Sequence, residues 1–194
     1  MSNVIEKPPT SQVKRGYFGI GVEGISKAQN LGTLMRSAYA FGADFFFSIA
    51  PDLNMKDVRH SDTADASQHM PFYEFDSAND LLLPKGCRLV AIELLDDAVE
   101  LPSFRHPTQA AYVLGPEMGD VSPTMLEKCD HVLKIPTRFC INVGVAGALV
   151  MYDRLVSTGR FDPRPVKPGG PTEKRETHPH GHRRIDRHEK ANKR

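Results

Sequence analysis

Short apolar runs alternate along the chain with segments in which apolar residues recur every three or four positions. The runs have the length and composition of buried strands, and they lie at residues 17–22, 44–50, 88–94, 110–114 and 131–135. Helical periodicity is found at residues 26–41, 122–127 and 142–158. Residues 52–76 are less regular, with one short helix expected at 64–69. This alternation predicts an α/β domain with a largely parallel sheet.

The ends of the expected helices carry the residues that helix ends favour. Ser26 and Gln29 have the spacing of a capping box, which predicts that both side chains bind free backbone N–H groups of the first turn. Gly42 is placed to end that helix in the left-handed conformation. Ser122 and Pro123 open a second helix, because proline at the first helical position loses no hydrogen bond.

The last expected helix is apolar on nearly every side between Val143 and Tyr152, which predicts that it is buried. Its two glycines, Gly144 and Gly147, each cost about 1 kcal/mol relative to alanine, so we expect another backbone to lie close to them. Asn142 precedes this helix, where its amide either caps the backbone or holds a substrate, and the local sequence leaves both open.

Charge and composition divide the 194 residues into three parts. Residues 1–14 are polar and predict a flexible arm, and residues 15–160 contain the periodic segments and predict a single domain. From Arg160 onward eleven Lys and Arg oppose five Asp and Glu, although the formal net charge of the whole chain is only +1. Residues 161–194 have few large apolar side chains and predict a disordered basic tail. Such a tail either binds phosphate groups non-specifically or serves only solubility.

The sequence also argues against several classes of protein. Its longest apolar segment, residues 141–152, falls short of the roughly 18 to 20 residues of a membrane span. The first residues contain no apolar stretch of a secretion signal, so we expect a cytoplasmic protein with no membrane partner. Cys87, Cys129 and Cys140 are odd in number and lack the spacing of zinc ligands, which predicts reduced thiols and no metal.

The first expected strand contains the glycine pattern Gly19-x-Gly21-x-x-Gly24, which is also the pattern of dinucleotide-binding enzymes. Those enzymes place the first glycine after a strand and the third in the opening of a helix. Here the glycines lie along the strand itself, and Asp44, at the spacing of a ribose-binding acid, begins a strand instead of ending one. A dinucleotide is therefore not expected.

Three motifs follow one another at compatible spacing. They are Asn30-x-Gly32-x-x-x-Arg36, Leu114-Gly115-Pro116-Glu117-Met118-Gly119, and Ile135-Pro136 with Asn142-Val143-Gly144-Val145-Ala146. Together they resemble the SpoU/TrmH family of the SPOUT superfamily, whose members are RNA ribose 2′-O-methyltransferases, and the resemblance covers about residues 17–155. It implies S-adenosylmethionine as methyl donor, tRNA or rRNA as substrate, a C-terminal trefoil knot and a homodimer.

The resemblance also implies functions for individual residues. The expected catalytic residues are Asn30, Arg36, Glu117 and Asn142. The cofactor is expected to contact residues of the second and third motifs, namely Leu114, Gly115, Glu117, Gly119, Ile135, Cys140 and Val143. RNA is expected to contact Arg36 on the basis of the resemblance, and the tail residues Arg183, Arg184 and Arg187 on the basis of their charge. Arg138 either contacts RNA as well or is simply solvated, and the sequence leaves both open.

Arg36 lies opposite the apolar stripe of its helix, and two chemical roles are open for it. The family's arginine is often described as the group that takes the proton of the 2′-hydroxyl. A guanidinium group holds its own proton far above neutral pH, however. A fixed cation that binds the neighbouring phosphate and stabilises the developing alkoxide is an equal alternative.

The third motif departs from the family at two positions. The family typically carries serines on both sides of its asparagine, where this chain has Cys140 and Gly144. The loss of these hydroxyl groups weakens the expected hydrogen bonding to substrate. The alternative function is therefore a non-catalytic RNA-binding or ribosome-assembly protein that retains the fold.

Overall fold

A computed structural model describes residues 16–53, 69–159, 161, 164–165 and 168–170. The chain divides into two units, Met1–Gly159 and Arg160–Arg194. The arm expected at 1–14, most of the basic tail and residues 64–68 of the short helix lie outside the described residues, so these expectations stay predictions.

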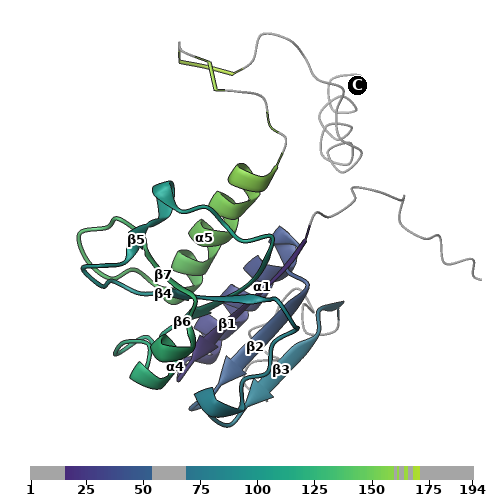
Figure 1. Cartoon of the computed structure of the whole chain (residues 1–194), viewed down its shortest axis with the longest axis vertical. Coiled ribbons are helices and arrows are strands. Elements are labelled where there is room, and N and C mark those ends of the chain that lie inside the picture. Colours follow the sequence, from purple (N-terminus) through teal and green to yellow (C-terminus); the bar gives the residue numbers. More distant parts are fainter. Residues whose placement is uncertain (1–15, 54–68, 160, 162–163, 166–167, 171–194) are drawn as a thin grey trace, which may run out of the picture. The chain divides into compact units, whose positions relative to one another are not determined.

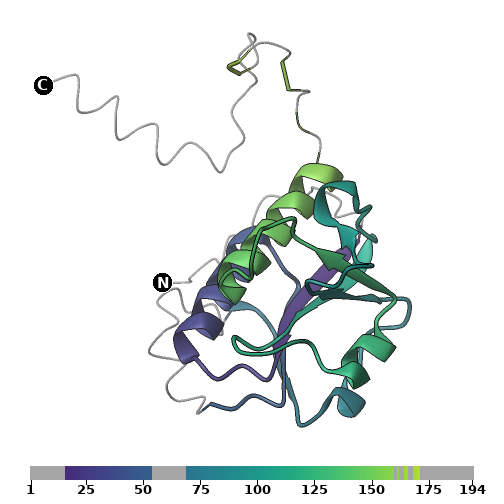
Figure 2. The ribbon, with the colours of Figure 1, turned by 90° about the vertical axis from the view of Figure 1, so that its left-hand side faces the viewer.

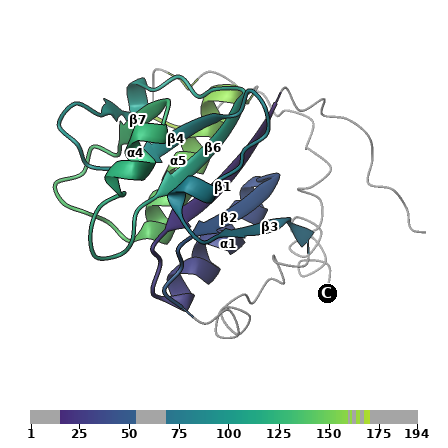
Figure 3. The same cartoon turned by 60° about the horizontal axis from the view of Figure 1, so that its bottom comes forward.

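The first unit is built on a parallel sheet, which in the described residues has seven strands in the order β3-β2-β1-β6-β4-β7-β5 (Figure 1). The strands are β1 Tyr17–Glu23, β2 Phe45–Ile49, β3 Phe72–Phe75, β4 Arg88–Ile92, β5 Val99–Glu100, β6 Gln109–Leu114 and β7 His131–Lys134. The labels in Figure 3 follow this order from β7 across to β3. The expected α/β class with a parallel sheet is confirmed.

Helices cover both faces of the sheet. The α-helices are α1 Ala28–Phe41, α4 Pro123–Lys128 and α5 Val143–Thr158, and the 3-10 turns are η1 Ala78–Asp80 and η2 Leu101–Ser103. Figure 2 shows α1 and α5 on one face and α4 on the other. Each face buries its own apolar cluster, with Leu34 and Val150 in the first and Met125 in the second.

The two faces follow from the alternation of side chains along the strands. In β6, Tyr112 lies in the cluster under α1 and α5, whereas Val113 lies in the cluster under α4. In β1, Ile20 and Val22 face α1 and α5, and glycines occupy the alternate positions. A Cβ atom at Gly19 or Gly21 would collide with the aromatic ring of Phe45 or Phe47, respectively. These glycines therefore make room for β2, and they do not form a nucleotide-binding turn.

Two strands, β3 and β5, are absent from the sequence expectations. The burial of β3 is intermediate at both ends and exposed in the middle, since it lies at the edge of the sheet. The other edge strand, β5, has only two residues, both exposed. Edge strands lack the continuous apolar run by which the inner strands were recognised.

The helix ends confirm two expectations and correct one. Gly42 ends α1 with φ 75°, and Ser122 accepts a hydrogen bond from the Met125 N–H ahead of Pro123, as expected. The capping box of Ser26 and Gln29 is wrong, because α1 begins after Lys27 and has no side-chain cap of that kind. A carboxylate from a distant loop takes its place, as described below.

The expected burial of α5 is only half right. Seven of its residues are buried, including Gly144 and Gly147, but five large apolar residues are 36 to 52% exposed: Val145, Leu149, Tyr152, Leu155 and Val156. The neighbours of the two glycines are also different from the expectation. A Cβ atom at Gly144 would lie 2.9 Å from Cγ2 of Thr33, and one at Gly147 would collide with Leu34. Side chains of α1, and not another backbone, come close to α5.

Some further properties of the described residues bear on function. Among the described residues, no helix is long and apolar enough to cross a membrane. The same residues contain no group of three or more His, Cys, Asp or Glu side chains that could hold a metal ion. Cys87, Cys129 and Cys140 are free thiols. The threading of the C-terminal segment into a knot stays a prediction.

Candidate functional site

A cavity of about 450 Å³ opens at the carboxyl edge of the sheet. Its walls are the segments that follow β4, β6 and β7, together with the first turns of α1 and α5. Open α/β sheets bind their ligands at this edge, where the direction of strand order reverses. The volume lies in the range of small-molecule sites.

Most of the residues singled out from the sequence meet at this cavity. All seven expected cofactor contacts line it, and so do Asn30 and Asn142. Arg36 and Arg138 are exposed and are not among the lining residues. Arg183, Arg184 and Arg187 lie outside the described part of the chain.

Glu117, on the loop after β6, is bonded to the start of α1. Its Oε2 accepts hydrogen bonds from the backbone N–H and the hydroxyl of Ser26, each at 3.2 Å. Its Oε1 accepts from the Lys27 N–H at 3.1 Å and from the side-chain amide of Asn30 at 2.9 Å. The Glu117 carboxylate thus binds the two backbone N–H groups directly ahead of Ala28, the first residue of α1, and places a negative charge at the start of that helix.

These donors determine the charge of Glu117. Partial burial raises the pKa of its carboxyl group, but the hydrogen bonds from Asn30 and Ser26 outweigh that effect and leave the pKa below its usual value. Glu117 is therefore an anion at neutral pH. An anion that lines the cavity suits a ligand with a positive charge.

Asn30 and Asn142 join this network to the start of α5. The Asn142 amide donates to Oδ1 of Asn30 at 2.9 Å. Oδ1 of Asn142 accepts from the N–H groups of Gly144 and Val145, so the same side chain caps α5. Asn142 therefore does cap the helix, and its remaining amide group is used by Asn30. One chain of hydrogen bonds connects all three motifs.

Two further carboxylates, which the sequence analysis missed, hold the loop after β6 from the other side. Glu23, the last residue of β1, accepts from the N–H of Ser122 at 2.8 Å and from its hydroxyl at 2.6 Å. Glu93, directly after β4, accepts from the Val121 N–H at 2.8 Å and also lines the cavity. Their position at the carboxyl ends of two strands was a signal available in the sequence.

Gly115 fits the close packing of this loop. A Cβ atom at this position would lie 2.9 Å from the backbone nitrogen of Val121. Gly119 has φ 124°, a conformation that residues with a side chain rarely adopt. The loop therefore folds back on itself and presents main chain, not side chains, to part of the cavity.

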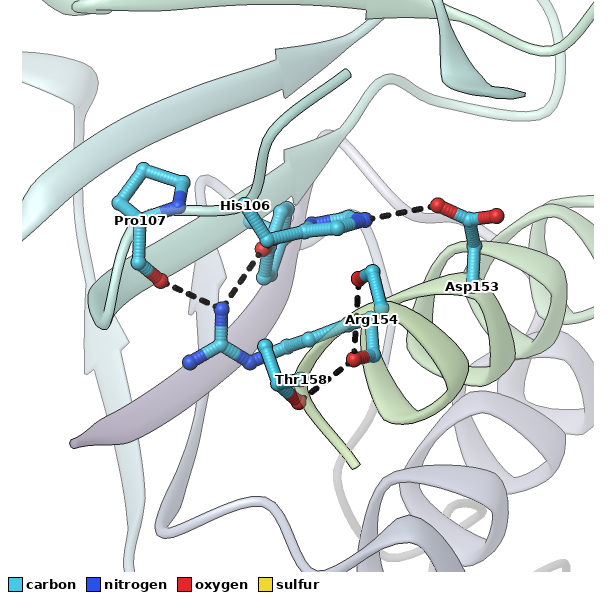
Figure 4. A network of polar contacts seen from close by, with 7 residues as sticks. His106, Pro107, Asp153, Arg154 and Thr158 are labelled. Atoms are coloured by element: carbon cyan, nitrogen blue, oxygen red, sulfur yellow. Dashed lines mark hydrogen bonds and ion pairs between the residues drawn. The ribbon is translucent and has the colours of Figure 1, made fainter. Parts of the chain in front are cut away.

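A second polar cluster lies apart from the cavity and was also missed (Figure 4). The fully buried ring of His106 contacts the Tyr112 hydroxyl at 2.6 Å through Nδ1 and Asp153 at 3.0 Å through Nε2. Arg154 donates to the carbonyl groups of Pro107 and Thr108 and to the Tyr112 hydroxyl. This cluster fastens α5 to the segment before β6, which makes it structural.

The protonation of this cluster follows from its contacts. Burial lowers the pKa of His106, although Asp153 opposes the shift, so the ring is neutral. Burial raises the pKa of Tyr112 to about 12, although Arg154 opposes the shift. Because the Asp153 carboxylate can only accept, Nε2 of the neutral His106 ring carries the proton and donates to Asp153. Nδ1 therefore accepts from the Tyr112 hydroxyl, whose oxygen accepts in turn from Arg154.

Residues 18–152 match the model of the SpoU rRNA Methylase family. No curated protein matches the sequence. Many solved structures share the fold.

Three of these structures illustrate the likeness. A TrmH/SpoU tRNA modifying enzyme from A. aeolicus is 19% identical with a TM-score of 0.60, over 72% of this chain and 74% of that one. A structure concerned with 2-OH methylation of C/U34 on tRNA is 21% identical with a TM-score of 0.63, over 74% and 97%. The SpoU methyltransferase AviRb from Streptomyces viridochromogenes, in complex with the cofactor AdoMet, is 18% identical with a TM-score of 0.66, over 78% and 64%.

Proposed function

The chain belongs to the SpoU rRNA Methylase family, and on that premise we propose that it transfers a methyl group from S-adenosylmethionine to the 2′-hydroxyl of a ribose in structured RNA. The substrate that we propose is tRNA or rRNA. AviRb, which shares the fold, contains AdoMet in its structure. We also propose the threaded C-terminal knot and a cytoplasmic location, for which the support is the family resemblance and the sequence.

One observation carries this proposal. Asn30, Glu117 and Asn142 come from three motifs that are far apart in sequence, yet hydrogen bonds join them at the wall of one cavity. A structural turn or a solvated surface would not require these three motifs to converge. Their convergence supports a site that holds a donor and an acceptor together.

The cavity has the properties that the donor requires. Gly115 and Ile135 offer main chain for an adenosine, and Glu93 and Glu117 place negative charge in the wall. The sulfonium of S-adenosylmethionine supplies an already activated methyl group, so the protein's task is alignment. The two carboxylates favour the positive charge of the donor over its neutral product.

Arg36 is proposed to act on the methyl acceptor, the ribose 2′-hydroxyl of the RNA. It lies on α1, the helix that Glu117 and Asn30 attach to the cavity, and its side chain is exposed on the side away from the buried stripe. We propose that its fixed positive charge binds a substrate phosphate and stabilises the alkoxide that forms as the 2′-hydroxyl loses its proton. Removal of the proton by Arg36 itself remains the second possibility for this residue.

The remaining RNA contacts are proposed from charge. Arg138 is exposed on the loop between β7 and α5, next to residues that line the cavity. Arg183, Arg184 and Arg187 belong to the basic tail, whose contribution to RNA binding should fall steeply with salt concentration.

A homodimer is proposed from the open face of α5. Val145, Leu149, Tyr152 and Val156 are spaced four, three and four residues apart, so they form one apolar stripe along the helix. Contiguous exposed apolar patches of this kind mark protein interfaces. A second copy of the chain would bury the stripe.

The second candidate is a non-catalytic RNA-binding protein, which the third motif favours. Cys140 and Gly144 replace the serines that the family typically carries, and Thr33 leaves too little room for a side chain at position 144. Calorimetric titration with S-adenosylhomocysteine separates the two candidates. An enzyme should give a heat of binding that saturates at one site per chain, whereas a non-catalytic protein without a cofactor site should give no heat of binding.

Methyl transfer tests the proposed function itself. Purified protein is incubated with cellular tRNA and rRNA and with methyl-labelled donor, and the RNA is then hydrolysed in alkali. A methylated 2′-oxygen cannot attack the adjacent phosphate, so label in alkali-resistant dinucleotides supports ribose methylation. Label confined to alkali-labile mononucleotides indicates base methylation, and absence of label contradicts the proposal.

A further inference from the structure

Phe139 is the most exposed aromatic side chain near the cavity, at 75%. It lies in the loop between β7 and α5, and the two aliphatic residues of that loop behave differently. Ile135 and Ile141 both pack against the core cluster under α1 and α5. The loop therefore partly buries its two isoleucine side chains and leaves its one aromatic ring in solvent.

The turn that carries Phe139 is held by internal hydrogen bonds. The Thr137 N–H donates to the Ile135 carbonyl at 2.7 Å. The Thr137 hydroxyl donates to the Phe139 carbonyl at 2.9 Å. An exposed ring on a turn that is already ordered loses little conformational entropy when a ligand covers it.

The ring lies beside the cavity and is not part of its lining. Thr137 and Cys140, on either side of Arg138 and Phe139 in sequence, both line the cavity. On the loop after β6 the same arrangement recurs, since Met118 is 86% exposed between the lining residues Glu117 and Gly119. Large apolar side chains thus stand outside the cavity on two of the loops that form its walls.

The residue before Phe139 in the sequence carries a positive charge, which indicates the chemistry of the partner. Arg138 is exposed and, within the described residues, makes no hydrogen bond or ion pair. A cation adjacent to an exposed aromatic ring suits a nucleotide, which has a phosphate for the cation and a flat base for the ring. An aliphatic partner would need neither the flat ring nor the charge.

We propose that Phe139 is the platform on which a base of the RNA substrate stacks when its ribose is presented to the cavity, with Arg138 binding the adjacent phosphate. This inference rests on the proposed function and adds a base-binding position to it. RNA-binding proteins recognise unpaired bases by stacking them on aromatic side chains. The acceptor nucleotide is therefore expected to be unpaired, in a loop or a bulge.

The test measures RNA binding and methyl transfer separately. The probes are bulk tRNA and rRNA prepared from cells that lack this chain, and the variants are Phe139→Ala, Phe139→Leu and Phe139→Tyr. Leu82→Ala is the matched control, because Leu82 is 81% exposed and lies on a segment that contributes no residue to the cavity lining. Titration with S-adenosylhomocysteine and sedimentation measure the donor site and the oligomeric state of every variant.

Stacking predicts a definite order among the variants. Phe139→Ala and Phe139→Leu should weaken RNA binding about 5- to 100-fold, the range for one stacked base, while Phe139→Tyr and Leu82→Ala stay within about threefold of the wild type. Donor affinity and sedimentation should be unchanged in all four. Leucine keeps apolar volume without an aromatic face, so its loss of binding identifies stacking.

Several results would overturn the platform. One is RNA binding that is unaltered in Phe139→Ala or complete in Phe139→Leu. Another is a change in the sedimentation of these variants, which would mark Phe139 as a subunit contact. A wild-type protein that binds neither tRNA nor rRNA would also overturn it. Failure of the proposed function looks different. A wild type that binds RNA through Phe139 but transfers no methyl group keeps the platform and removes the enzyme.

Discussion

The side-chain amide of Asn30 donates a 2.9 Å hydrogen bond to the carboxylate of Glu117, although 87 residues separate the two in the chain. Through this bond, the loop that lines the cavity is attached to the helix that carries Arg36. The same carboxylate accepts the N–H groups at the start of that helix. The position of the start of α1, which forms one wall of the cavity, therefore depends on the ionised Glu117 side chain from the loop after β6, which forms another wall.

Glu117→Gln should weaken both stability and transfer. The amide replaces one carboxylate oxygen by an NH₂ group, so two of the four donors around Glu117 lose their acceptor. Lost hydrogen bonds of this kind cost about 1 to 3 kcal/mol of unfolding free energy. Urea unfolding measures the loss, and Glu127→Gln, on an exposed position of α4, should leave stability unchanged. Equal effects of the two substitutions would refute the capping role of Glu117.

Gly144→Ser, which restores the family's usual residue, should destabilise the protein. The new Cβ atom lies 2.9 Å from Cγ2 of Thr33, and the Thr33 hydroxyl is held by the Gln29 carbonyl, so the threonine cannot easily turn away. Overpacking of this kind costs about 1 to 3 kcal/mol. Thr33→Ser removes the methyl group and should restore most of the stability in the double variant, as measured by thermal unfolding. A double variant no more stable than Gly144→Ser alone would contradict this account.

Leu149→Asp should convert the proposed dimer to a monomer. Leu149 is 40% exposed in the middle of the apolar stripe on α5, and a buried unpaired carboxylate at an interface is strongly unfavourable. Sedimentation equilibrium measures the mass. Leu82→Asp, which places the same charge at an exposed position outside α5, is the control and should leave the mass at twice that of one chain. A wild-type protein that sediments as a monomer would exclude the proposed dimer.

The stability of the protein should fall as the pH drops below about 6.5. Burial lowers the pKa of His106 in the folded state, whereas the unfolded chain has the ordinary value of about 6.5. A histidine whose pKa is lower in the folded state contributes its full stability at pH values above its unfolded pKa. That contribution is lost as the pH falls from the unfolded pKa through the lower folded pKa. Urea midpoints at pH 7.5 and 5.0 measure the effect.

Two histidine variants isolate the source of that pH dependence. His106→Asn, which has no titrating ring, should be less stable at pH 7.5 but should lose less stability on acidification. His131→Gln, at an exposed position, should behave as the wild type. If His106→Asn kept the full pH dependence, other groups would be responsible.

The inner part of the fold is predictable because its signals are local. The apolar runs of β1, β2, β4, β6 and β7 and the glycine at the end of α1 were recognised from neighbouring residues alone. The start of α1 was not, because its N–H groups are bound by Glu117 from a loop distant in sequence. Likewise, the open face of α5 has the composition of a buried helix.

The candidate site was partly predictable for a similar reason. The motif spacing indicated Asn30, Glu117 and Asn142, but their mutual hydrogen bonds depend on the packing of α1, α5 and the loop after β6. Glu23 and Glu93 belong to none of the three motifs, so their position at the carboxyl ends of β1 and β4 was their only signal in the sequence. Their bonds to Ser122 and Val121, respectively, depend on the folded structure. The Gly19-x-Gly21 pattern, by contrast, is a packing feature of β1 and carries no ligand signal.

The most direct test of the account is a transfer reaction with a donor whose methyl group carries deuterium, followed by mass spectrometry of the RNA nucleosides. The RNA comes from cells that lack this chain, and Arg36→Ala is compared with the wild type. A deuterated 2′-O-methyl nucleoside is expected with the wild type and none with Arg36→Ala, while both proteins should bind S-adenosylhomocysteine equally. A wild type that yields no such nucleoside, or an Arg36→Ala variant that transfers at the wild-type rate, would contradict the account.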